Sequence, residues 1–268
     1  MKTYMLDKVL DVDTTYEAES DKGYIIRKVG TTSTSKVTLS VAGTDCLEII
    51  DKIARAHPTE YYLYDLLDLG DLYIVVPPNK KISFTGASGS KLRIVGEILE
   101  LTPGEALPSP FMGRYAEQGR KYISYLTGSY SHGADTAWTA DDENDVIDKT
   151  AEAGTRYTLN SLFYAELANL AAVHSPGDWT IRLYLQGAPL DILSTNMGDL
   201  GIDLWKAYWN DGTNYFYKPF TLEKMPITLE PGRSFVASMI NSSGANKSPS
   251  SGNSLTATFY VACVKELL

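Results

Sequence analysis

The sequence repeats itself at a fixed spacing, and this repeat constrains the fold more than any other feature. Residues 62–82 align without a gap on residues 215–235, an offset of 153 positions. Five of the 21 aligned positions are identical: Tyr62/Tyr215, Tyr64/Tyr217, Leu69/Leu222, Ile74/Ile227 and Pro78/Pro231. A self-match of this kind predicts two similar units in tandem.

The match continues on both sides once loop lengths are allowed to differ. Residues 37–43 align on 181–187 at an offset of 144, and residues 95–101 align on 261–267 at an offset of 166. The second copy has therefore gained residues between the matched segments. Surface loops tolerate such insertions because the entropy of loop closure grows slowly with length. Chance similarity between β-rich segments is the alternative explanation.

Composition places the chain among folded globular proteins. A length of 268 residues suits one large domain or two ordinary ones, and the repeat favours two. Hydrophobic residues make up 44% and charged residues 21% of the chain, which argues against disorder. The net charge is −9. Direct binding of nucleic acid is not expected, because it requires clustered Lys and Arg.

Features of export are missing from the sequence. The N-terminal segment MKTYMLDKVLD lacks the apolar core of a signal peptide, so we expect cytoplasmic synthesis without one. The longest apolar-leaning stretch, residues 162–173, is interrupted by Glu166 and Asn169 and is too short to span a bilayer. Cys46 and Cys263 stand at non-equivalent positions of the two copies, which indicates neither a disulfide framework nor a zinc site.

Alternation of apolar and polar residues predicts strands along most of the chain. Gly, Pro, Asn and Ser separate the alternating runs, as they do in β-sandwiches and barrels. The prediction is therefore an all-β fold with two tandem sandwich domains. Strands are expected at residues 23–29, 36–41, 72–76, 81–84 and 92–101 of the first copy. In the second copy they are expected at residues 121–126, 179–186, 214–220, 226–229, 234–240 and 254–264.

One element of each copy is expected to be a short helix inserted between strands. In the first copy Asp45 can cap a helix, Glu48 completes a box-like arrangement, and Pro58 ends the run. In the second copy Pro189 suits a first helical turn, and residues 203–209 resume the pattern. An irregular loop is the alternative there. The apolar face of the first helix would consist of Cys46, Ile49, Ile50 and Ile53.

The boundary between the copies is expected near two closely spaced prolines, Pro108 and Pro110, which favour an extended and stiff connector. The predicted organisation is a first domain at 1–107, a connector at 108–112 and a second domain at 113–268. The second domain is expected to carry two long exposed loops, at residues 129–155 and 242–253.

The sequence contains no nucleophile elbow, phosphate loop, dinucleotide fingerprint or paired-cysteine zinc motif. His57, His132 and His174 are scattered, and none has a second ligand at metal-binding spacing. Residues 86–91 and 243–248 contain phosphate-loop residue types at the wrong spacing and are typical of turns. We therefore predict no enzyme, with no catalytic, cofactor-binding or metal-binding residues. An enzyme on a β-sandwich scaffold ranks third among the hypotheses.

Three groups of residues have more than one interpretation. The acidic run Asp141–Asp145 has oxygen ligands suited to calcium but lacks the glycine and spaced glutamate of a helix–loop–helix site, so a solvated loop is preferred. Asn241 and Asn246 begin glycosylation sequons, which we interpret as loop composition. Clustered aromatic residues predict a core or subunit interface, with a sugar-binding platform as the alternative. These aromatic residues are Tyr61, Tyr62, Tyr64, Trp205, Tyr208, Trp209, Tyr215 and Tyr217.

Two sandwich copies, each with a helix after a strand that ends in Gly, resemble the double jelly-roll major capsid proteins of membrane-containing icosahedral viruses of bacteria and archaea. The matching segments are residues 36–56 and 180–193, each followed by one copy of the 21-residue repeat. The resemblance implies two tandem jelly rolls and no cofactor. It also implies a homotrimer whose six barrels form a pseudo-hexagonal capsomer of the virion shell.

Partners implied by the resemblance are neighbouring capsomers, minor capsid or spike proteins, and an underlying viral membrane. The loops at 129–155 and 242–253 would then be exposed on the shell. Some relatives have a basic N-terminal segment that faces the membrane, whereas Asp7, Asp11, Asp13, Glu17 and Glu19 make this one acidic, which argues against such a contact. The second hypothesis is a tandem carbohydrate-binding or receptor-binding protein, such as a viral spike.

Overall fold

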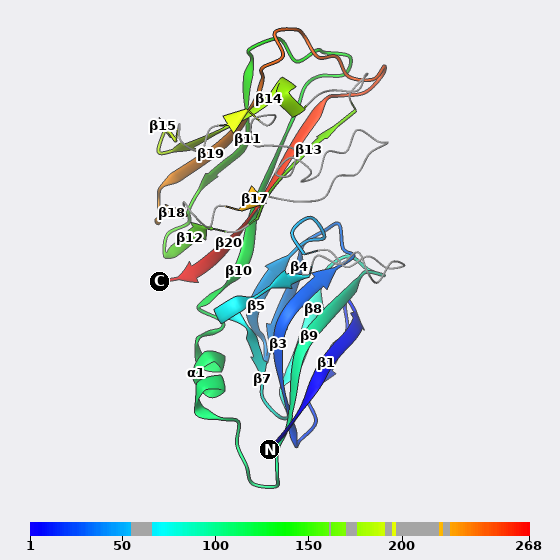
Figure 1. Ribbon diagram of the computed structural model, residues 1–268, viewed down its shortest axis with the longest axis vertical. Helices are drawn as coiled ribbons and strands as arrows, with labels where there is room; N and C mark the ends of the chain where they lie inside the picture. The colour runs from blue at the N-terminus through cyan, green and yellow to red at the C-terminus, as the bar shows by residue number, and fades with distance from the viewer. Residues whose placement is uncertain (55–65, 161, 170–175, 191–194, 197–219, 222–225) are drawn as a thin grey trace. The chain divides into compact units, whose positions relative to one another are not determined.

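The chain divides into two compact units. The first comprises Met1–Tyr125 together with Val264–Leu268, and the second comprises Leu126–Cys263. The computed structural model describes residues 1–54, 66–160, 162–169, 176–190, 195–196, 220–221 and 226–268 (Figure 1). Part of each copy of the 21-residue repeat (62–65, 215–219 and 222–225) and the whole aromatic cluster lie outside these residues, as do the expected strand at 214–220, apart from Phe220, and the expected helix at 203–209.

The first unit is a double sheet whose strands are antiparallel, except that Ile123 pairs in parallel with Leu47 (Figure 1). One sheet has the order β1-β9-β3, with β6 and β7 both paired to β3, and the other has the order β2-β8-β4-β5. Strands that follow one another along the chain mostly alternate between the sheets, which is the order of a jelly roll. The strands are β1 (Lys2–Asp11), β2 (Thr15–Glu17), β3 (Lys22–Thr31), β4 (Val37–Val41), β5 (Thr44–Ile49), β6 (Leu67–Asp68), β7 (Ile74–Val76), β8 (Lys81–Thr85) and β9 (Lys91–Glu100).

The second unit has the same plan. One sheet has the order β17-β13-β20-β10, with β12 paired to β20 and β18, and the other has the order β11-β19-β14-β15, with β16 also paired to β14. The all-β prediction is confirmed, and each unit has the strand order of a jelly roll. The strands are β10 (Lys121–Ser131), β11 (Glu143–Thr150), β12 (Thr155–Leu159), β13 (Leu162–Ala168), β14 (Trp179–Leu185), β15 (Ala188–Pro189), β16 (Thr195–Asn196), β17 (Phe220–Thr221), β18 (Ile227–Leu229), β19 (Ser234–Asn241) and β20 (Thr256–Leu267).

Sheet registers show that the two units are copies. Ser40 of β4 pairs with Ser83 of β8. Tyr184 lies 144 positions after Ser40, and Val236 lies 153 positions after Ser83; these two residues also pair, between β14 and β19. All four residue pairs of β4 and β8 recur in this way. Since a slip of one residue would turn every side chain to the opposite face, an unchanged register preserves the whole inward-facing set.

The duplication extends to segments that the sequence comparison did not match. Tyr24 of β3 pairs with Val76 of β7, and Tyr157 of β12 pairs with Leu229 of β18. The first members of these pairs differ by 133 positions and the second members by 153. Ala18 and Ala151, which are 133 positions apart and both buried, make equivalent pairs of backbone hydrogen bonds: each donates to and accepts from the turn that follows β7 or β18. Two identities, Tyr24/Tyr157 and Ala18/Ala151, are too sparse to be recognised in the sequence.

Hairpin turns also recur at equivalent positions. Ala42 and Gly43 connect β4 to β5 with φ values of 51° and 82°, and Gln186 and Gly187 connect β14 to β15 with φ values of 54° and 75°. Two successive residues with positive φ form the tight turn that matches the twist of a two-residue hairpin. The glycine at the end of each matched strand is thus explained by backbone conformation.

Just before the segment matched at offset 166, the structure supports an offset of 165. Extended by one residue, the offset of 166 would align Ile94, which is buried inside the first sandwich, with the partly exposed Tyr260. An offset of 165 aligns Ile94 with Phe259, which is fully buried in the core of the second unit. The same offset aligns the carbonyl groups of Ser90 and Leu255, each of which accepts a 3.0 Å hydrogen bond from the chain just after β1 or β10.

The helix predicted after residue 43 is wrong. Residues 44–49 form β5, in which Leu47 pairs with Leu39 on the interior side of the sheet. Cys46 faces the other side and is also buried, with Gln118 of a following segment beside its thiol. Burial on both faces produced apolar positions at helix-like spacing. In the second copy, Pro189 belongs to strand β15 instead of a first helical turn, and residues 191–194 lie outside the described chain.

The predicted extended connector is helical. Helix α1 (Ser109–Glu117) begins within it, with proline in its first turn. Arg114 donates hydrogen bonds to the carbonyl groups of Leu72 and Tyr73, at 3.3 and 2.9 Å. The segment from α1 to the first residues of β10 therefore packs with the first unit, and the compact units divide at Tyr125/Leu126, beyond the expected boundary at 108–112.

The segment just after α1 covers one edge of the first sandwich. Gln118 is buried, and its side-chain amide accepts a hydrogen bond from the N–H of Val75 at 2.9 Å and donates one to its carbonyl at 3.1 Å. This side chain takes the place of a neighbouring strand along β7. Edges covered in this way cannot pair with another chain.

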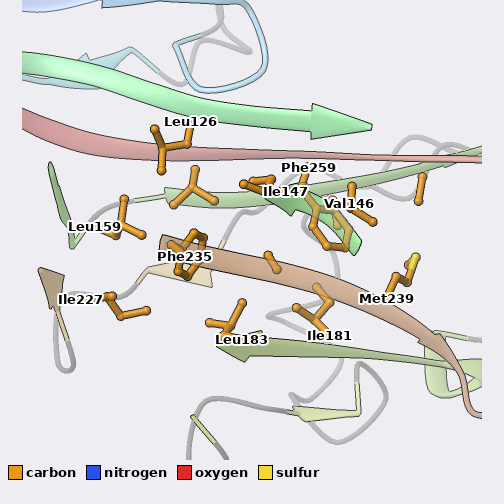
Figure 2. Close-up of a cluster of buried hydrophobic side chains, with 14 of the residues drawn as sticks. Leu126, Val146, Ile147, Leu159, Ile181, Leu183, Ile227, Phe235, Met239 and Phe259 are labelled. Atoms are coloured by element: carbon orange, nitrogen blue, oxygen red, sulfur yellow. The ribbon is translucent and has the colours of Figure 1, made fainter. Parts of the chain in front are cut away.

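Inward-facing side chains of both sheets form the core of the second unit (Figure 2). Phe235 of β19 and Phe259 of β20 lie within it and are fully buried. Ile181 and Leu183 of β14 are inward-facing, two positions apart, as the period of a strand requires. The predicted alternation thus corresponds to one buried face on each strand.

Candidate functional site

Two loops at one end of the second unit hold each other in place. We call residues 132–142, which follow β10, and residues 242–255, which follow β19, the loop cluster. Trp138 and Lys247 form an isolated antiparallel bridge, with hydrogen bonds of 2.8 and 2.9 Å between their backbone groups. Asp135 accepts a 2.7 Å hydrogen bond from the N–H of Gly252. The predicted loop at 242–253 is confirmed, whereas the one at 129–155 is interrupted by β11.

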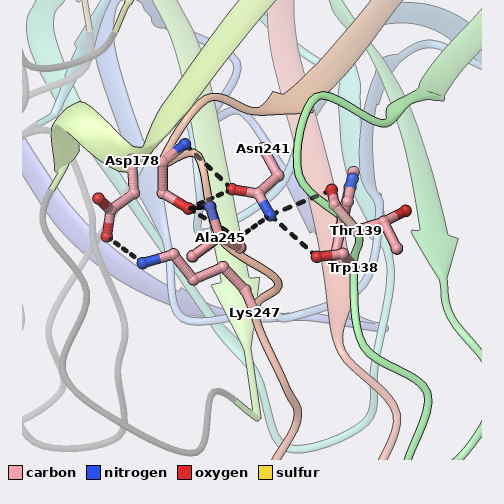
Figure 3. A network of polar contacts seen from close by, with 7 residues as sticks. Trp138, Thr139, Asp178, Asn241, Ala245 and Lys247 are labelled. Carbon is pink, nitrogen blue, oxygen red and sulfur yellow. Dashed lines mark hydrogen bonds and ion pairs between the residues drawn. The ribbon is translucent and has the colours of Figure 1, made fainter.

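Asn241, the last residue of β19, organises the cluster (Figure 3). Its side chain is fully buried, and its amide nitrogen donates to the carbonyl groups of Trp138, Thr139 and Ala245 at 2.9, 3.1 and 2.8 Å. Its amide oxygen accepts from the hydroxyl of Ser243 at 2.7 Å. Every hydrogen-bonding group of this amide is therefore used. Glycosylation of Asn241 is incompatible with the folded loops, whereas Asn246 is exposed.

A partly buried ion pair fixes the second loop from the other side. Lys247 Nζ lies 2.8 Å from Asp178 Oδ2, and their side chains are 17% and 21% exposed (Figure 3). Asp178 ends the short helix η2 (Pro176–Asp178), and its carbonyl also accepts from the N–H of Ser242 at 2.7 Å. Nothing in the sequence marks these residues as partners, because they are 69 positions apart.

His132, the first residue of the loop cluster, belongs to a group of packed aromatic rings. Its ring centroid lies 4.9 Å from that of Trp138 and 5.1 Å from that of Tyr130. Trp138 also contacts Trp179 edge to face at 5.2 Å, and both indoles are fully buried. Burial lowers the pKa of His132, although the carboxylate of Asp142 acts in the opposite direction. These two tryptophans fill the core and offer no platform for a sugar.

The acidic run does not converge on one point. Glu143 accepts hydrogen bonds from Arg182 at 2.7 Å, Tyr184 at 2.5 Å and Ser238 at 2.7 Å, which occupies its oxygens. Asp142 accepts from the side chain of Asn144. Among the residues that the structure describes, no three Asp, Glu, His or Cys side chains are grouped as metal ligands.

The remaining candidates from the sequence are dispersed or outside the described chain. His57 and His174 lie outside it, as do the clustered aromatic residues at 61–64 and 205–217. Cys46 and Cys263 are both buried and are not joined in a disulfide, and burial raises the pKa of the Cys46 thiol to about 11, so it remains protonated at neutral pH. In the described part of the chain, no helix has the length and apolar character needed to cross a bilayer.

Comparisons with known proteins find matches only among solved structures. No family model and no curated protein sequence matches this chain. The major capsid protein P2 of bacteriophage PM2 matches 98% of this chain and 98% of its own, with 10% identity and a TM-score of 0.38. The STIV major capsid protein matches 96% of each chain, with 10% identity and a TM-score of 0.36.

A β-porphyranase of glycoside hydrolase family 86 from Bacteroides plebeius, BpGH86A, also matches 96% of this chain. Only 35% of the enzyme takes part in the match, with 11% identity and a TM-score of 0.21. At these identities and scores, no residue role is carried over from any of the three proteins.

Proposed function

We propose that this chain is a structural subunit of a virion shell, a major capsid protein whose homotrimers form pseudo-hexagonal capsomers. The observation that carries the proposal is the duplication at the level of register. Both units have the same interleaved strand order and, between β4 and β8 and between β14 and β19, the same residue pairs, so the backbones of their walls follow one plan. Three such chains around a threefold axis present six similar walls, which suits tiling of a surface.

The outer face of β1 is the wall that we assign to contacts between copies. Met5 and Val9 lie on the same face of this strand and are 73% and 53% exposed. Between them Asp7 forms a two-bonded ion pair with Arg93, at 2.9 and 2.8 Å, which fixes the charged groups of the face. Exposed apolar side chains grouped on one face are typical of protein–protein interfaces.

The mass of the purified chain in solution tests this proposal. We expect light scattering to give three times the chain mass of 29.5 kDa, and electron microscopy to show particles with a six-sided outline. A monomer at every concentration up to about 100 µM would overturn the proposed shell function, because interfaces of obligate oligomers are normally stable at far lower concentrations.

Substitutions on β1 locate the interface. Met5→Lys should weaken trimer formation at least tenfold, whereas Met112→Lys on α1, where the side chain is 40% exposed, should leave it unchanged. Trimers that form equally well with Met5→Lys would remove β1 from the interface without affecting the oligomeric state itself.

A further inference from the structure

The first sandwich contains a cavity of about 160 Å³ between β1, β2 and the strands behind them. Charged and tyrosine side chains surround its entrance, and aliphatic side chains form its inner wall. The entrance residues are Lys8, Tyr16, Glu17, Glu19 and Tyr24. The inner wall is formed by Leu6, Leu10, Ile26, Ile82 and Ile94, all of which are buried.

The second unit has larger side chains at two of the corresponding positions. Ile82 corresponds to Phe235 at the offset of 153, and Ile94 corresponds to Phe259 at the offset of 165. Both phenylalanines are fully buried. The two units therefore differ in side-chain size at these positions: the first has aliphatic side chains beside a cavity, and the second has phenyl rings.

The first strands of the two units, β1 and β10, also differ beside this cavity. Val12 and His132 make equivalent backbone hydrogen bonds, so β1 and β10 correspond at an offset of 120, and Lys8 corresponds to Gly128. A Cβ atom on Gly128 would lie 2.1 Å from the carbonyl oxygen of Val146, because β10 and β11 approach closely there. In the first unit, the long side chain of Lys8 stands at the entrance instead.

Lys8 brings a positive charge to an apolar cavity. It lies between the buried Leu6 and Leu10 on one side of β1, and its Nζ is 5.4 Å from the ring centroid of Tyr24. Among the described residues, no carboxylate forms an ion pair with it. Lys22 neutralises Glu19 at 2.5 Å, which leaves Glu17 as the one entrance carboxylate that opposes an incoming anion.

Tyrosine hydroxyls provide further donors at the entrance. Tyr16 accepts a 3.2 Å hydrogen bond from the N–H of Asp11, so its own proton remains available for an acceptor. Burial raises the pKa of Tyr24, which keeps its hydroxyl protonated. An ammonium group and two phenols around an aliphatic cavity match a ligand with an anionic head and an apolar tail.

We propose that this cavity binds a saturated carboxylate of about six to eight carbons, with its tail among the five aliphatic side chains and its head at Lys8. An apolar cavity of about 150 Å³ accommodates a group the size of benzene, so the available volume holds about six carbons. Free fatty acids and anionic phospholipids share this chemistry of an anionic head on an aliphatic tail.

Calorimetric titration of the full chain with carboxylates from butanoate to decanoate tests the proposal. Affinity should rise about fourfold with each added methylene until the cavity is full, and then stay constant. Lys8→Met should weaken octanoate binding at least tenfold and leave 1-octanol binding unchanged. Lys2→Met removes a charge from the same strand away from the cavity and should change neither affinity.

Filling the cavity provides the second arm. The double variant Ile82→Phe with Ile94→Phe copies the side chains of the second unit and should abolish binding of octanoate and octanol. Octanoate binding that is unaffected by this double variant or by Lys8→Met would overturn the proposal, as would the absence of binding at any chain length. Displacement of octanoate by phosphatidylglycerol vesicles identifies a phospholipid as the source of the ligand, and retention of octanoate identifies a free fatty acid.

Discussion

Replacement of Asn241 by Ala should release the loop cluster of the second unit. The substitution removes three hydrogen bonds to backbone carbonyl groups and the acceptor used by Ser243. In the variant each carbonyl still has a donor within reach: the N–H of Lys247 at Trp138, the N–H of Asp142 at Thr139, and at Ala245 the hydroxyl of Ser243, whose one proton no longer goes to Asn241. The loss is therefore that of about three hydrogen bonds in a buried site and not of three orphaned groups.

At about 1 kcal/mol for each bond, and with a small cavity in place of the amide, we expect the free energy of unfolding to fall by about 2–4 kcal/mol. For a unit of this size, that corresponds to a decrease in melting temperature of roughly 4–16 °C. Asn241→Asp should cost more at neutral pH, because a carboxylate oxygen would then face the three carbonyl oxygens.

Calorimetry measures the loss of stability, and limited trypsin digestion locates it. The backbone N–H and carbonyl of Lys247 are both bonded to Trp138, so cleavage after Lys247 should be slow in the native protein and fast in the variant. Asn246→Asp is the matched control, since this exposed residue uses only its acceptor oxygen, on the N–H of Ala140. A loss below 1 kcal/mol, with Lys247 still protected, would refute the role assigned to Asn241.

Three further predictions concern other parts of the fold. Because burial lowers the pKa of His132, the unfolded chain binds a proton at this residue at a higher pH than the folded chain does. The contribution of neutral His132 to the free energy of unfolding should therefore be fully present above pH ~6.5 and should decrease below it. His132→Gln should flatten this pH dependence, as measured by urea titrations at several pH values. Gly96→Ala should destabilise the first unit by more than about 3 kcal/mol, since the new Cβ would lie 1.9 Å from a carbonyl oxygen of β3. Gly113→Ala, on the open face of α1, should instead stabilise the unit by about 0.5–1 kcal/mol. Equal melting temperatures of the two variants would contradict this contrast. Gln118→Ala should cost about 2–4 kcal/mol and speed amide exchange at Val75, and an unchanged exchange rate would show that the side chain does not cover this edge.

Most strands could be predicted because a half-buried strand carries its own signature. The alternation in residues 81–84, 234–240 and 254–264 corresponds to β8, β19 and β20. Strands β1, β2 and β11 were missed, since charged or exposed positions interrupt their pattern, whereas β12 was missed although buried and partly exposed residues alternate regularly along its five positions. The false helix at Asp45 arose from the opposite cause, as Cys46 is buried on the outer side of β5 by a segment about 70 positions later.

The loop cluster could be predicted only as loops. Its composition of Gly, Ser and Asn indicated turns, but the same composition suggested that Asn241 was an ordinary exposed sequon residue. Its burial depends on the chain at 138–139, about 100 positions away, and on the ion pair between Asp178 and Lys247. No local pattern records such contacts, because each partner has ordinary loop chemistry.

The sequence by itself determined the duplication and much of the pairing. Offsets of 144 and 153 convert the register of β4 and β8 into that of β14 and β19, because strand period and turn conformation are local properties that a copied segment retains. Only the tertiary structure decided how the copies differ. Gln118 covers an edge of the first sandwich, and Ile82 lines a cavity at the position where the second unit has the larger, buried Phe235. These outcomes depend on side chains far apart in the sequence that meet only when the sheets pack.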